Sequence, residues 1–491
     1  MHFYPPVLML HPRNFQSCNF FCTDICECVV IVLTLRKTPT YMKKILTLTA
    51  IVALILGLAS CSDNNTDKLL CSVPADADGV VVINYEKIVE DLNLKTDGDK
   101  VQFSNQLKTL FESEPAVSKL LSSGALKLAP MAFFYEDGQF YLTGFVADAD
   151  AFMSFVEKES NSTFQKNGSF SILTDGGASI AVVNDRFWIC DTDAEKNLAK
   201  FMEQDKDASI LSKEVSSMLK KDNCDLSGIV TMDVLTELAE SNSGLNPAQM
   251  AMVLGAVEHL AFDCSFNKGE ILATMCAVDA KGAPVDGKAL SKYFDKINMG
   301  TINCLTGDFD MIAACGIKPE LANALGSLMN AYGGLKVPQI EKIDGTMALG
   351  IQVRPEGNAS MMPMMMAVKM AEGDDAMALG QTVTSMTQNA VNVSVKGSTL
   401  LLRTASFTGK EAKAGACLKD LEGAYFGYVV APGVVKSYLP SNTIPFTGAS
   451  LTLRPDGDSF KMEMRILTGS DKNSLSTLVS LLNAAKKENR L

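Results

Sequence analysis

Pairs of short apolar runs joined by tight turns constrain the fold of this chain more than any other feature of its sequence. Each turn contains a glycine, which supplies the positive φ that a tight hairpin needs. The pairs are residues 131–135 with 139–146, 170–173 with 178–183, 259–266 with 270–278, and 450–453 with 459–467, and a further apolar run covers residues 186–190. The chain is therefore predicted to fold around antiparallel β-hairpins.

A helical pattern follows each hairpin. Asp148 or Asp150 is a suitable N-cap for the first of these helices, and residues 192–195 (Thr-Asp-Ala-Glu) fit a capping box for the second. A third helix is predicted around residues 290–297. The last, between residues 475 and 482, has apolar residues at i, i+3, i+4 and i+7, the spacing of an amphipathic helix that lies on an apolar surface.

A second pattern, a short apolar strand that runs into a short helix, occurs four times. It begins at positions 79, 228, 309 and 425, although common strand–helix patterning could produce the same likeness by chance. Together the two patterns predict two related halves, residues 73–298 and 301–491, each opening with strand and helix and ending with hairpin and helix. Because strands and helices do not alternate strictly, we expect an α+β fold of antiparallel sheets with helices covering one face, rather than a doubly wound sheet.

Residues 42–60 predict an export signal. Met42 is followed by two lysines, then by a mainly apolar run from residue 45 to residue 58, and then by the small residues Ala59 and Ser60. This order of charge, apolar run and small residues is typical of a secretory signal peptide. The apolar run is shorter than the roughly 20 residues that a membrane-spanning helix needs.

The end of this signal resembles the lipobox of bacterial lipoproteins. Residues 58–60 (Leu-Ala-Ser) precede Cys61, and in that family the signal is cut just before the cysteine, whose thiol receives a diacylglyceryl group. The resemblance implies cleavage between Ser60 and Cys61 and a lipid anchor on Cys61, with residues 61–72 as a polar tether. Two or more acyl chains hold a protein stably at a bilayer. The alternatives are an ordinary signal peptide or an N-terminal anchor helix, with Cys61 incidental.

The residues after Cys61 bear on location. By resemblance to Gram-negative sorting rules, Ser62 rather than aspartate at the next position directs the lipoprotein to the outer membrane. Residues 62–67 partly resemble the acidic export tag of surface-exposed Bacteroidetes lipoproteins, but their acids, Asp63 and Asp67, are not contiguous. We therefore expect the outer membrane, with the periplasmic side and the cell surface both left open.

Residues 1–41 do not fit this scheme, because no export machinery expects them ahead of a lysine-led signal. We expect translation to start at Met42, so that residues 1–41 are a mis-assigned upstream extension. The alternative is a metal-binding prefix, since cysteines occur at positions 18, 22, 26 and 28. Their spacing matches no common zinc pattern.

Two further segments resemble a family of Bacteroidetes lipoproteins that carry a domain of unknown function. Residues 73–84 contain Pro74, Asp76 and Ala77 ahead of a hydrophobic strand, and residues 471–475 resemble the family near its C-terminus. The resemblance spans the mature chain. Because the family has no established activity, the resemblance transfers no catalytic or binding residues to this sequence.

Groups suited to catalysis or metal binding do not form recognisable patterns. After residue 61 the chain has one histidine, His259, at the start of a predicted strand, and a zinc site with several histidines would need a partner chain. No nucleophile elbow, phosphate-binding loop or dinucleotide fingerprint occurs. Pairs of acids such as Asp308 and Asp310 suit turns and helix caps, and none completes a calcium-binding loop. We therefore predict no catalytic residue, no metal site and no cofactor.

Three other residue types are predicted to be structural. The eight cysteines after Cys61 lie mostly in apolar strand patterns and are expected to be reduced and buried. Trp188, the one tryptophan, is expected in the core rather than as a sugar-stacking platform. Residues 361–366, five of them methionine, indicate a core strand or a helix start, with a copper(I) site or a methionine-lined groove as alternatives.

Charge argues against one class of partner. The formal net charge is −12, and an acidic surface repels the phosphate backbone of nucleic acids. The sequence therefore predicts a lipid-anchored lipoprotein of the cell envelope, a non-catalytic binding or scaffolding module that presents a surface to an envelope protein or polymer. Two alternatives stay open: an envelope hydrolase with a carboxylate or Ser/Lys site between the halves, and a carrier of small apolar ligands.

The lipobox makes a direct prediction about Cys61. In a Gram-negative host, we expect the protein in the membrane fraction, with an N-terminal peptide that begins at residue 61 and carries the mass of the attached lipid. Cys61→Ser removes the thiol that is acylated, so the uncleaved and unlipidated precursor is expected to accumulate. Fractionation and intact-mass analysis measure both results. An unlipidated product that begins at residue 1 would contradict the anchor and the assignment of residues 1–41.

Overall fold

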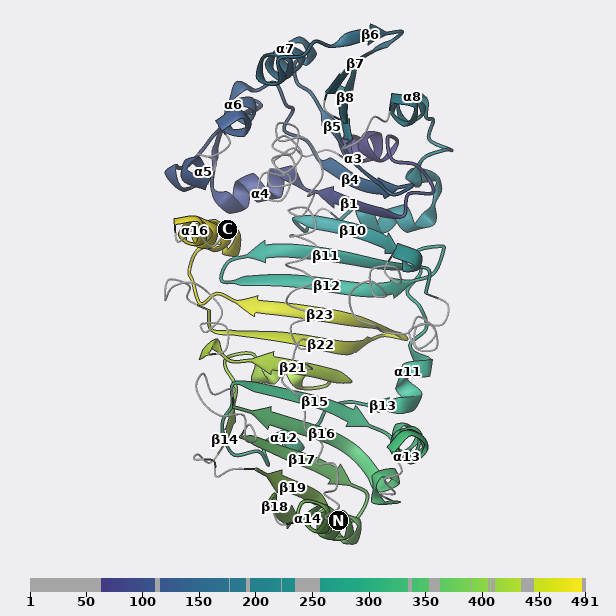
Figure 1. The fold of residues 1–491 in the computed structure, drawn as a ribbon, viewed down its shortest axis with the longest axis vertical. Helices are drawn as coiled ribbons and strands as arrows, with labels where there is room; N and C mark the ends of the chain where they lie inside the picture. The colour runs from purple at the N-terminus through teal and green to yellow at the C-terminus, as the bar shows by residue number, and fades with distance from the viewer. Residues whose placement is uncertain are drawn as a thin grey trace, which may run out of the picture. The chain divides into compact units, whose positions relative to one another are not determined.

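The computed structural model describes most of the chain after residue 62. The described residues are 63–110, 115–175, 177–190, 195–221, 223–234, 257–333, 338–352, 363–388, 390–404, 407, 411–433 and 446–487. The chain divides into two compact units, Met1–His259 (unit 1) and Leu260–Leu491 (unit 2). Helices and antiparallel strands occur in both units (Figure 1), so the predicted α+β class is confirmed.

The described part of unit 1 is built on an antiparallel sheet of eight strands. In sheet order these are β10 (Leu226–Thr231), β1 (Gly79–Ile83), β4 (Met131–Glu136), β5 (Gln139–Phe145), β9 (Arg186–Cys190), β8 (Ala178–Val183), β7 (Phe170–Asp175) and β6 (Gln165–Asn167). A separate small hairpin contains β2 (Lys95–Asp97) and β3 (Lys100–Gln102). The hairpins predicted at residues 131–146 and 170–183 are confirmed as β4–β5 and β7–β8.

Helices lie on both faces of the unit 1 sheet. They are α3 (Asp63–Leu70), α4 (Tyr85–Leu92), α5 (Asn105–Leu110), α6 (Pro115–Ser123), α7 (Ala149–Ser160), α8 (Glu195–Glu203) and the 3-10 helices η2 (Ile210–Ser212) and η3 (Glu214–Leu219). Phe152 of α7 stacks on Phe187, with 5.4 Å between ring centroids. Phe201 of α8 packs on Tyr141, whose side chain points to the other face. The prediction that helices cover one face is therefore wrong for this unit, because both faces are apolar.

The predicted tether after Cys61 is largely a packed helix. Residues 61–72 include α3, in which Leu69 and Leu70 are fully buried. Lys220 pairs with Asp67 of this helix, with 2.6 Å between Nζ and Oδ1. The polar sequence that suggests a tether thus supplies the solvated face of a helix. Cys61 itself lies outside the described residues.

The described part of unit 2 is built on a longer antiparallel sheet. In sheet order its strands are β12 (Glu270–Val278), β23 (Ser459–Leu467), β22 (Gly448–Asp456), β21 (Phe426–Val430), β15 (Met311–Ile317), β16 (Ile343–Ile351), β17 (Met364–Met370), β19 (Thr399–Arg403) and β18 (Asn392–Lys396). β13 (Phe294–Asp295) pairs with the end of β15, and β14 (Gly307–Asp308) pairs in parallel with β20 (Ala412–Lys413). β11 (His259–Asn267) precedes β12 across a short turn.

The helices of unit 2 confirm part of the predicted pattern. They are α11 (Lys288–Tyr293), α12 (Met299–Ile302), α13 (Pro319–Gly333), α14 (Gly373–Met386), α16 (Ser474–Lys487) and the 3-10 helices η4 (Pro338–Lys342) and η5 (Leu418–Leu421). The predicted amphipathic helix near the C-terminus is α16, which buries Leu475 and Val479. The helices predicted after the strands near positions 228 and 425 lie largely outside the described residues.

The division between the two units falls between His259 and Leu260, ahead of the predicted boundary at residues 298–301. The reason is strand pairing, because β12 hydrogen-bonds to β23, which comes from the other end of the chain. This pairing places β12 in unit 2, although β12 comes before the predicted boundary in the chain. The predicted boundary between related halves stays a prediction.

Gly316 offers a test of the pairing between β13 and β15. An added Cβ at residue 316 would overlap the carbonyl oxygen of Asp295, a backbone atom that cannot rotate away. We expect Gly316→Ala to destabilise the protein by about 1–3 kcal/mol or more, measured by urea unfolding. Gly79→Ala is the control, since its Cβ would meet atoms no nearer than 3.8 Å. Equal stability of the two variants would contradict this pairing.

Candidate binding face

The two faces of the unit 2 sheet differ in exposure at its central strands β15, β16 and β21. In β15, Ile312 and Ala314 point to one face and are buried, whereas Met311, Ala313 and Cys315 point to the other and are half-exposed. The same alternation continues in β16 and β21. Side chains alternate between the faces of a strand, so each residue can be assigned to the buried face, which carries Ile312, or to the open face, which carries Ala313.

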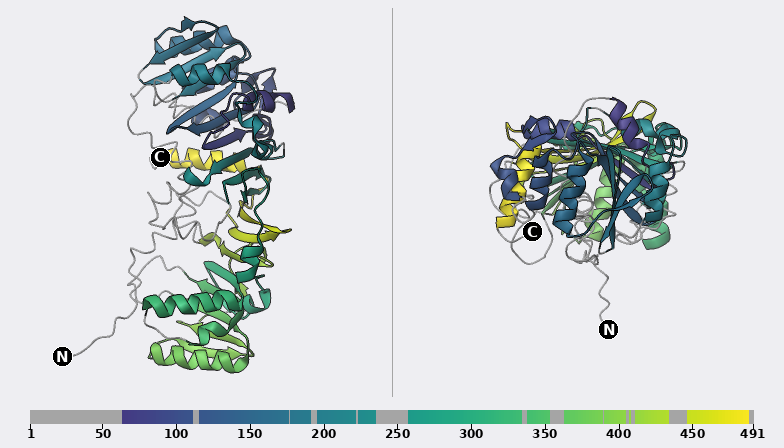
Figure 2. Two further views of the ribbon diagram at one scale, coloured as in Figure 1. Left: turned by 90° about the vertical axis from the view of Figure 1, so that its right-hand side faces the viewer. Right: turned by 90° about the horizontal axis from the view of Figure 1, so that it is seen from above.

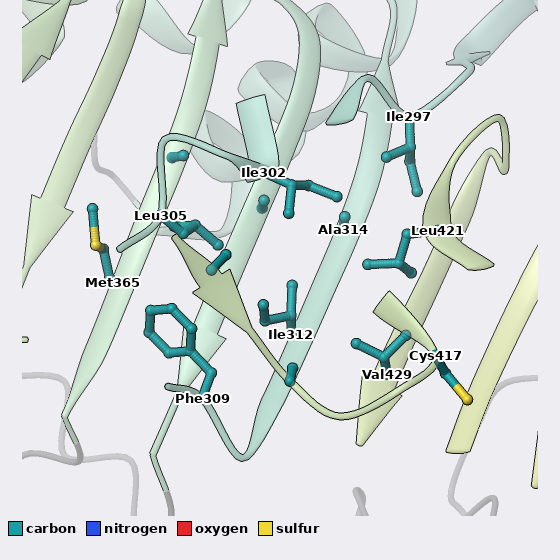
Figure 3. Close-up of a cluster of buried hydrophobic side chains, with 14 of the residues drawn as sticks. Ile297, Ile302, Leu305, Phe309, Ile312, Ala314, Met365, Cys417, Leu421 and Val429 are labelled. Carbon is teal, nitrogen blue, oxygen red and sulfur yellow. The ribbon is translucent and has the colours of Figure 1, made fainter. Parts of the chain in front are cut away.

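The buried face is covered by a tight apolar cluster (Figure 3). Ile302 of α12 and Leu421 of η5 pack toward Ile312 and Val429 of the sheet, and Phe309 lies beside them. Fully burying an aliphatic side chain of this size contributes roughly 1.5–3 kcal/mol. This cluster therefore holds the sheet to the elements on its buried side.

The open face is a continuous apolar surface. Residues paired directly across neighbouring strands form three rows over β12, β23, β22, β21, β15, β16 and β17. The first row is Met275, Met462, Leu453, Phe426, Cys315, Met347 and Val368. The second row is Ala273, Met464, Leu451, Tyr428, Ala313, Leu349 and Met366. The third row is Ile271, Ile466, Ala449, Val430, Met311, Ile351 and Met364. None of these side chains carries a charge, and seven of them are methionine.

Helices cover only the ends of this face in the described part of unit 2. α13 and α14 pack over the β16–β19 end, where Met347 and Met366 adjoin a buried cluster, and α16 contacts β12. The left view of Figure 2 shows these helices projecting from one side of the sheet. Over β21–β23 most of the side chains stay half-exposed, and Phe426 is 41% exposed.

The size of the open face makes it a candidate binding surface. Seven strands spaced by about 4.8 Å and three rows spaced by about 6.6 Å give a face of roughly 30 Å by 13 Å. Within it Ile271, Leu451 and Val368 are buried, and the other side chains of the rows are at least partly exposed. Contiguous apolar patches of a few hundred Å² on a soluble protein mark sites of interaction or ligand binding. The arrangement can bind an apolar group and offers little that could carry out acid–base chemistry.

The charged residues of the same strands point to the opposite face. Asp420 accepts hydrogen bonds from Ser450 Oγ at 2.6 Å and from Arg465 at 3.1 Å. Arg465 also pairs with Glu270, with 3.4 Å between Nε and Oε2. The guanidinium of Arg454 donates to the backbone carbonyls of Asp420 and Glu422. The charges of β12, β22 and β23 thus lie away from the open face.

The ionisable groups that unit 1 brings together form ion pairs. Lys87 lies 3.3 Å from buried Asp225 and 3.1 Å from Asp91. Burial acts to lower the pKa of Lys87, but the two carboxylates outweigh it and the pKa is raised. Burial raises the pKa of Glu136, and Lys200 at 3.3 Å opposes the shift. These contacts suit structural ion pairs.

The residues singled out from the sequence take several positions. Ser60 and Cys61 lie outside the described residues. His259 is the first residue of β11 and is half-buried. Trp188 is fully buried beneath Arg186, at 5.2 Å from guanidinium carbon to ring, so the core placement is confirmed.

The methionine-rich segment divides between the two faces. Met365 is fully buried on the buried face, whereas Met364 and Met366 belong to the open face. This confirms the core-strand interpretation for Met365. The positions 361 and 362 lie outside the described residues. The open face as a whole is not evident from the sequence, because its rows join strands that are far apart in the chain.

The cysteines and acidic clusters are structural in the described residues. None of the eight cysteines after Cys61, all of them described, forms a disulfide bond, and three are buried: Cys190, Cys224 and Cys417. Asp148 caps α7 by accepting the Ala151 N–H at 2.9 Å. Within the described ranges, no three His, Cys, Asp or Glu side chains come together as a metal site. Of the helices described, none has the length and apolar character to cross a bilayer.

Comparisons with known proteins add little to these observations. No protein-family model matches the chain, and no curated protein matches it. Among solved structures, crystal form IV of TP0453 is similar over 42% of this chain and 78% of that chain, at 12% identity and a TM-score of 0.29. Crystal form III is similar over 45% and 85%, at 10% identity and a TM-score of 0.30. Likenesses this weak carry no structural or functional argument.

Two thiols, Cys315 in β15 and Cys417 at the start of η5, give a test of the packing around the sheet. Burial raises the pKa of Cys315 and of Cys417 to about 11, and Asp420 adds to the shift at Cys417. Because only the thiolate reacts, both cysteines are expected to alkylate far more slowly at pH 8 in the folded protein than in denaturant. Since the folded pKa is the higher one, their contribution to stability is present below about pH 9 and is lost as pH rises through about 11.

Peptide mass spectrometry after timed alkylation measures these rates for each cysteine. The denatured protein is the control, because there both thiols return to the ordinary pKa. Labelling of Cys417 at the same rate in the folded and the denatured protein would contradict its burial.

Proposed function

We propose that this chain is a lipid-anchored lipoprotein of the cell envelope, held at the outer membrane through Cys61, and that unit 2 is a non-catalytic binding module. The lipobox resemblance of residues 58–61 supports the anchor. The open face supports the binding role, and its three charge-free rows are the observation that carries the proposal. Whether the module faces the periplasm or the cell surface depends on export signals that the tether resembles only in part.

The chemistry of the open face favours binding over hydrolysis. Its rows hold no acid and no base, and their polar side-chain atoms are the Tyr428 hydroxyl, the Cys315 thiol and the methionine thioethers. The Cys315 pKa of about 11 keeps that thiol protonated at neutral pH, so it is a poor nucleophile. The open face therefore supports a binding role rather than a hydrolytic one.

We also propose that residues 73–298 and 301–491 are related halves. Support comes from the order of strand pairing. In unit 1 the order is β10-β1-β4-β5-β9-β8, and in unit 2 it is β21-β15-β16-β17-β19-β18. The six strands of each order can be renumbered 1 to 6 by their position in the chain, with β6 and β7 set aside as an insertion. Both sheet orders then read 6-1-2-3-5-4.

Helices in matching positions give this proposal further support. Numbered by chain position, strand 1 (β1 or β15) is followed by a helix in both units, α4 and α13. Another helix follows the hairpin of strands 2 and 3, α7 and α14. A 3-10 helix precedes strand 6, η3 and η5. The next strands in the chain are β11 and β12 in one case and β22 and β23 in the other. That correspondence favours a boundary near residue 298 over one at residue 259.

Methionine oxidation tests whether the open face is occupied in the envelope. A thioether that is covered by a ligand or partner is shielded from peroxide. We expect Met275, Met462 and Met464 to oxidise several-fold more slowly in native outer-membrane vesicles than in the purified mature protein with Cys61→Ser. Mass spectrometry of peptides measures the rates.

Two internal controls accompany this experiment. Met365 is fully buried and Met377 is 50% exposed on α14, so the first should resist and the second should react in both samples. Equal oxidation rates for the open-face methionines in vesicles and in solution would contradict the proposed binding role. Resistance like that of Met365 in the isolated protein would mean that the chain covers its own face.

A further inference from the structure

We infer that the ligand of the open face is a hydrocarbon chain, the acyl chain of a membrane lipid bound as a single molecule. This inference rests on the proposed binding role of unit 2 and names its ligand class. Three properties of the face support it: its hydrogen-bonding capacity, the flexibility of its side chains and the placement of charge around it.

The open face has almost no capacity for hydrogen bonds. Each strand from β23 to β17 pairs with a neighbour on both sides, so the backbone N–H and C=O groups under the face are used within the sheet. Among the side chains of the rows, only the Tyr428 hydroxyl is a strong donor or acceptor. Protein interfaces make about one hydrogen bond per 100–200 Å², and a polymer of sugars needs more. A hydrocarbon chain needs none, so it can lie here without leaving a polar group unpaired.

The methionines suit a ligand without fixed shape. Methionine is unbranched and polarisable and can repack around different partners. Met275 and Met462 are direct partners across β12 and β23, and Met464 is the next residue of β23 on the same face. Such a surface can accept acyl chains that differ in length or in double bonds, which a rigid surface of branched side chains would discriminate.

Charge complementarity points the same way. The chain has a net charge of −12, yet the rows are neutral, because Glu270, Glu463 and Arg465 of the same strands point to the buried face. A neutral, apolar ligand therefore has the smallest desolvation cost on binding to this face. The anchor proposed at Cys61 would hold the protein where acyl chains are abundant.

A fluorescent fatty acid tests the inference directly. The mature chain, residues 61–491 with Cys61→Ser, is titrated with parinaric acid, whose emission rises in an apolar site. Saturated fatty acids of increasing length then displace it. Each added CH₂ is expected to strengthen displacement about two- to fourfold, because burying a CH₂ contributes about 0.8 kcal/mol when it is fully enclosed. Affinity that is independent of chain length would overturn the inference.

Variants locate the bound chain. Met464→Asp places a charge in the second row, between Ala273 and Leu451, and is expected to weaken binding more than tenfold, whereas Met377→Asp on exposed α14 should leave it within about twofold. Aspartate is preferred to lysine, since lysine could reach solvent and attract the fatty-acid carboxylate. Met464→Leu is expected to retain binding, because a hydrocarbon needs no thioether; loss of fatty-acid binding in this variant would contradict the inference.

Circular dichroism checks that each variant is folded, and Met462→Gln, a neutral change of similar shape, replaces Met464→Asp if that variant unfolds. Unchanged binding in the folded variant would overturn the inference. If fatty acids do not bind but Met464 is shielded in the envelope, the binding role survives and the ligand is a protein or a second copy of the chain. If nothing binds and nothing shields Met464, both proposals fail.

Discussion

The register of the unit 2 strands is the constraint on which the open face depends. Because side chains alternate along a strand, a slip of one residue would exchange the two faces. Arg465 would then reach the open face, and Met464 would enter the buried one. The bonds from Ser450 and Arg465 to Asp420 oppose this slip, since they form only when the polar residues of β22 and β23 face η5. A few polar contacts on one side thus determine an apolar surface on the other.

An apolar sheet face left half-exposed does not serve the stability of the free protein. Each Å² of apolar surface kept in water forgoes roughly 25 cal/mol, and unit 1 shows that a sheet with the same strand order can be covered on both sides. There Phe152 of α7 stacks on Phe187, and Phe201 of α8 packs on Tyr141. In the described part of unit 2, α13 and α14 cover the β16–β19 end of the open face and leave β21–β23 half-exposed. This difference in cover between the two sheets is explained if the open face binds a ligand, because the bound ligand would shield the exposed rows from water.

The local parts of the fold could be predicted from the sequence, and the long-range parts could not. The β4–β5 hairpin and the Asp148 cap of α7 depend on neighbouring residues, so turn and capping patterns reveal them. The sequence pattern does not reveal β16, because glycines interrupt it. Gly350 is needed there, since an added Cβ would lie 2.6 Å from the ring of Phe309, yet glycine within a short run is typical of a turn. The pairing of β12 with β23 joins distant segments, and no periodicity in either strand identifies its partner.

The packing of α3 changes what a lipid on Cys61 would do. A flexible tether would let the body move far from the bilayer, but α3 begins at Asp63 and is fixed to unit 1 by buried Leu69 and Leu70. Two residues of extended chain reach at most roughly 7 Å. A lipid on Cys61 would therefore hold the start of α3 close to the membrane surface and would restrict the orientations of unit 1. A polar segment that predicts freedom of movement from its composition would then act as a short, rigid connection, because Leu69 and Leu70 fix its helix to unit 1.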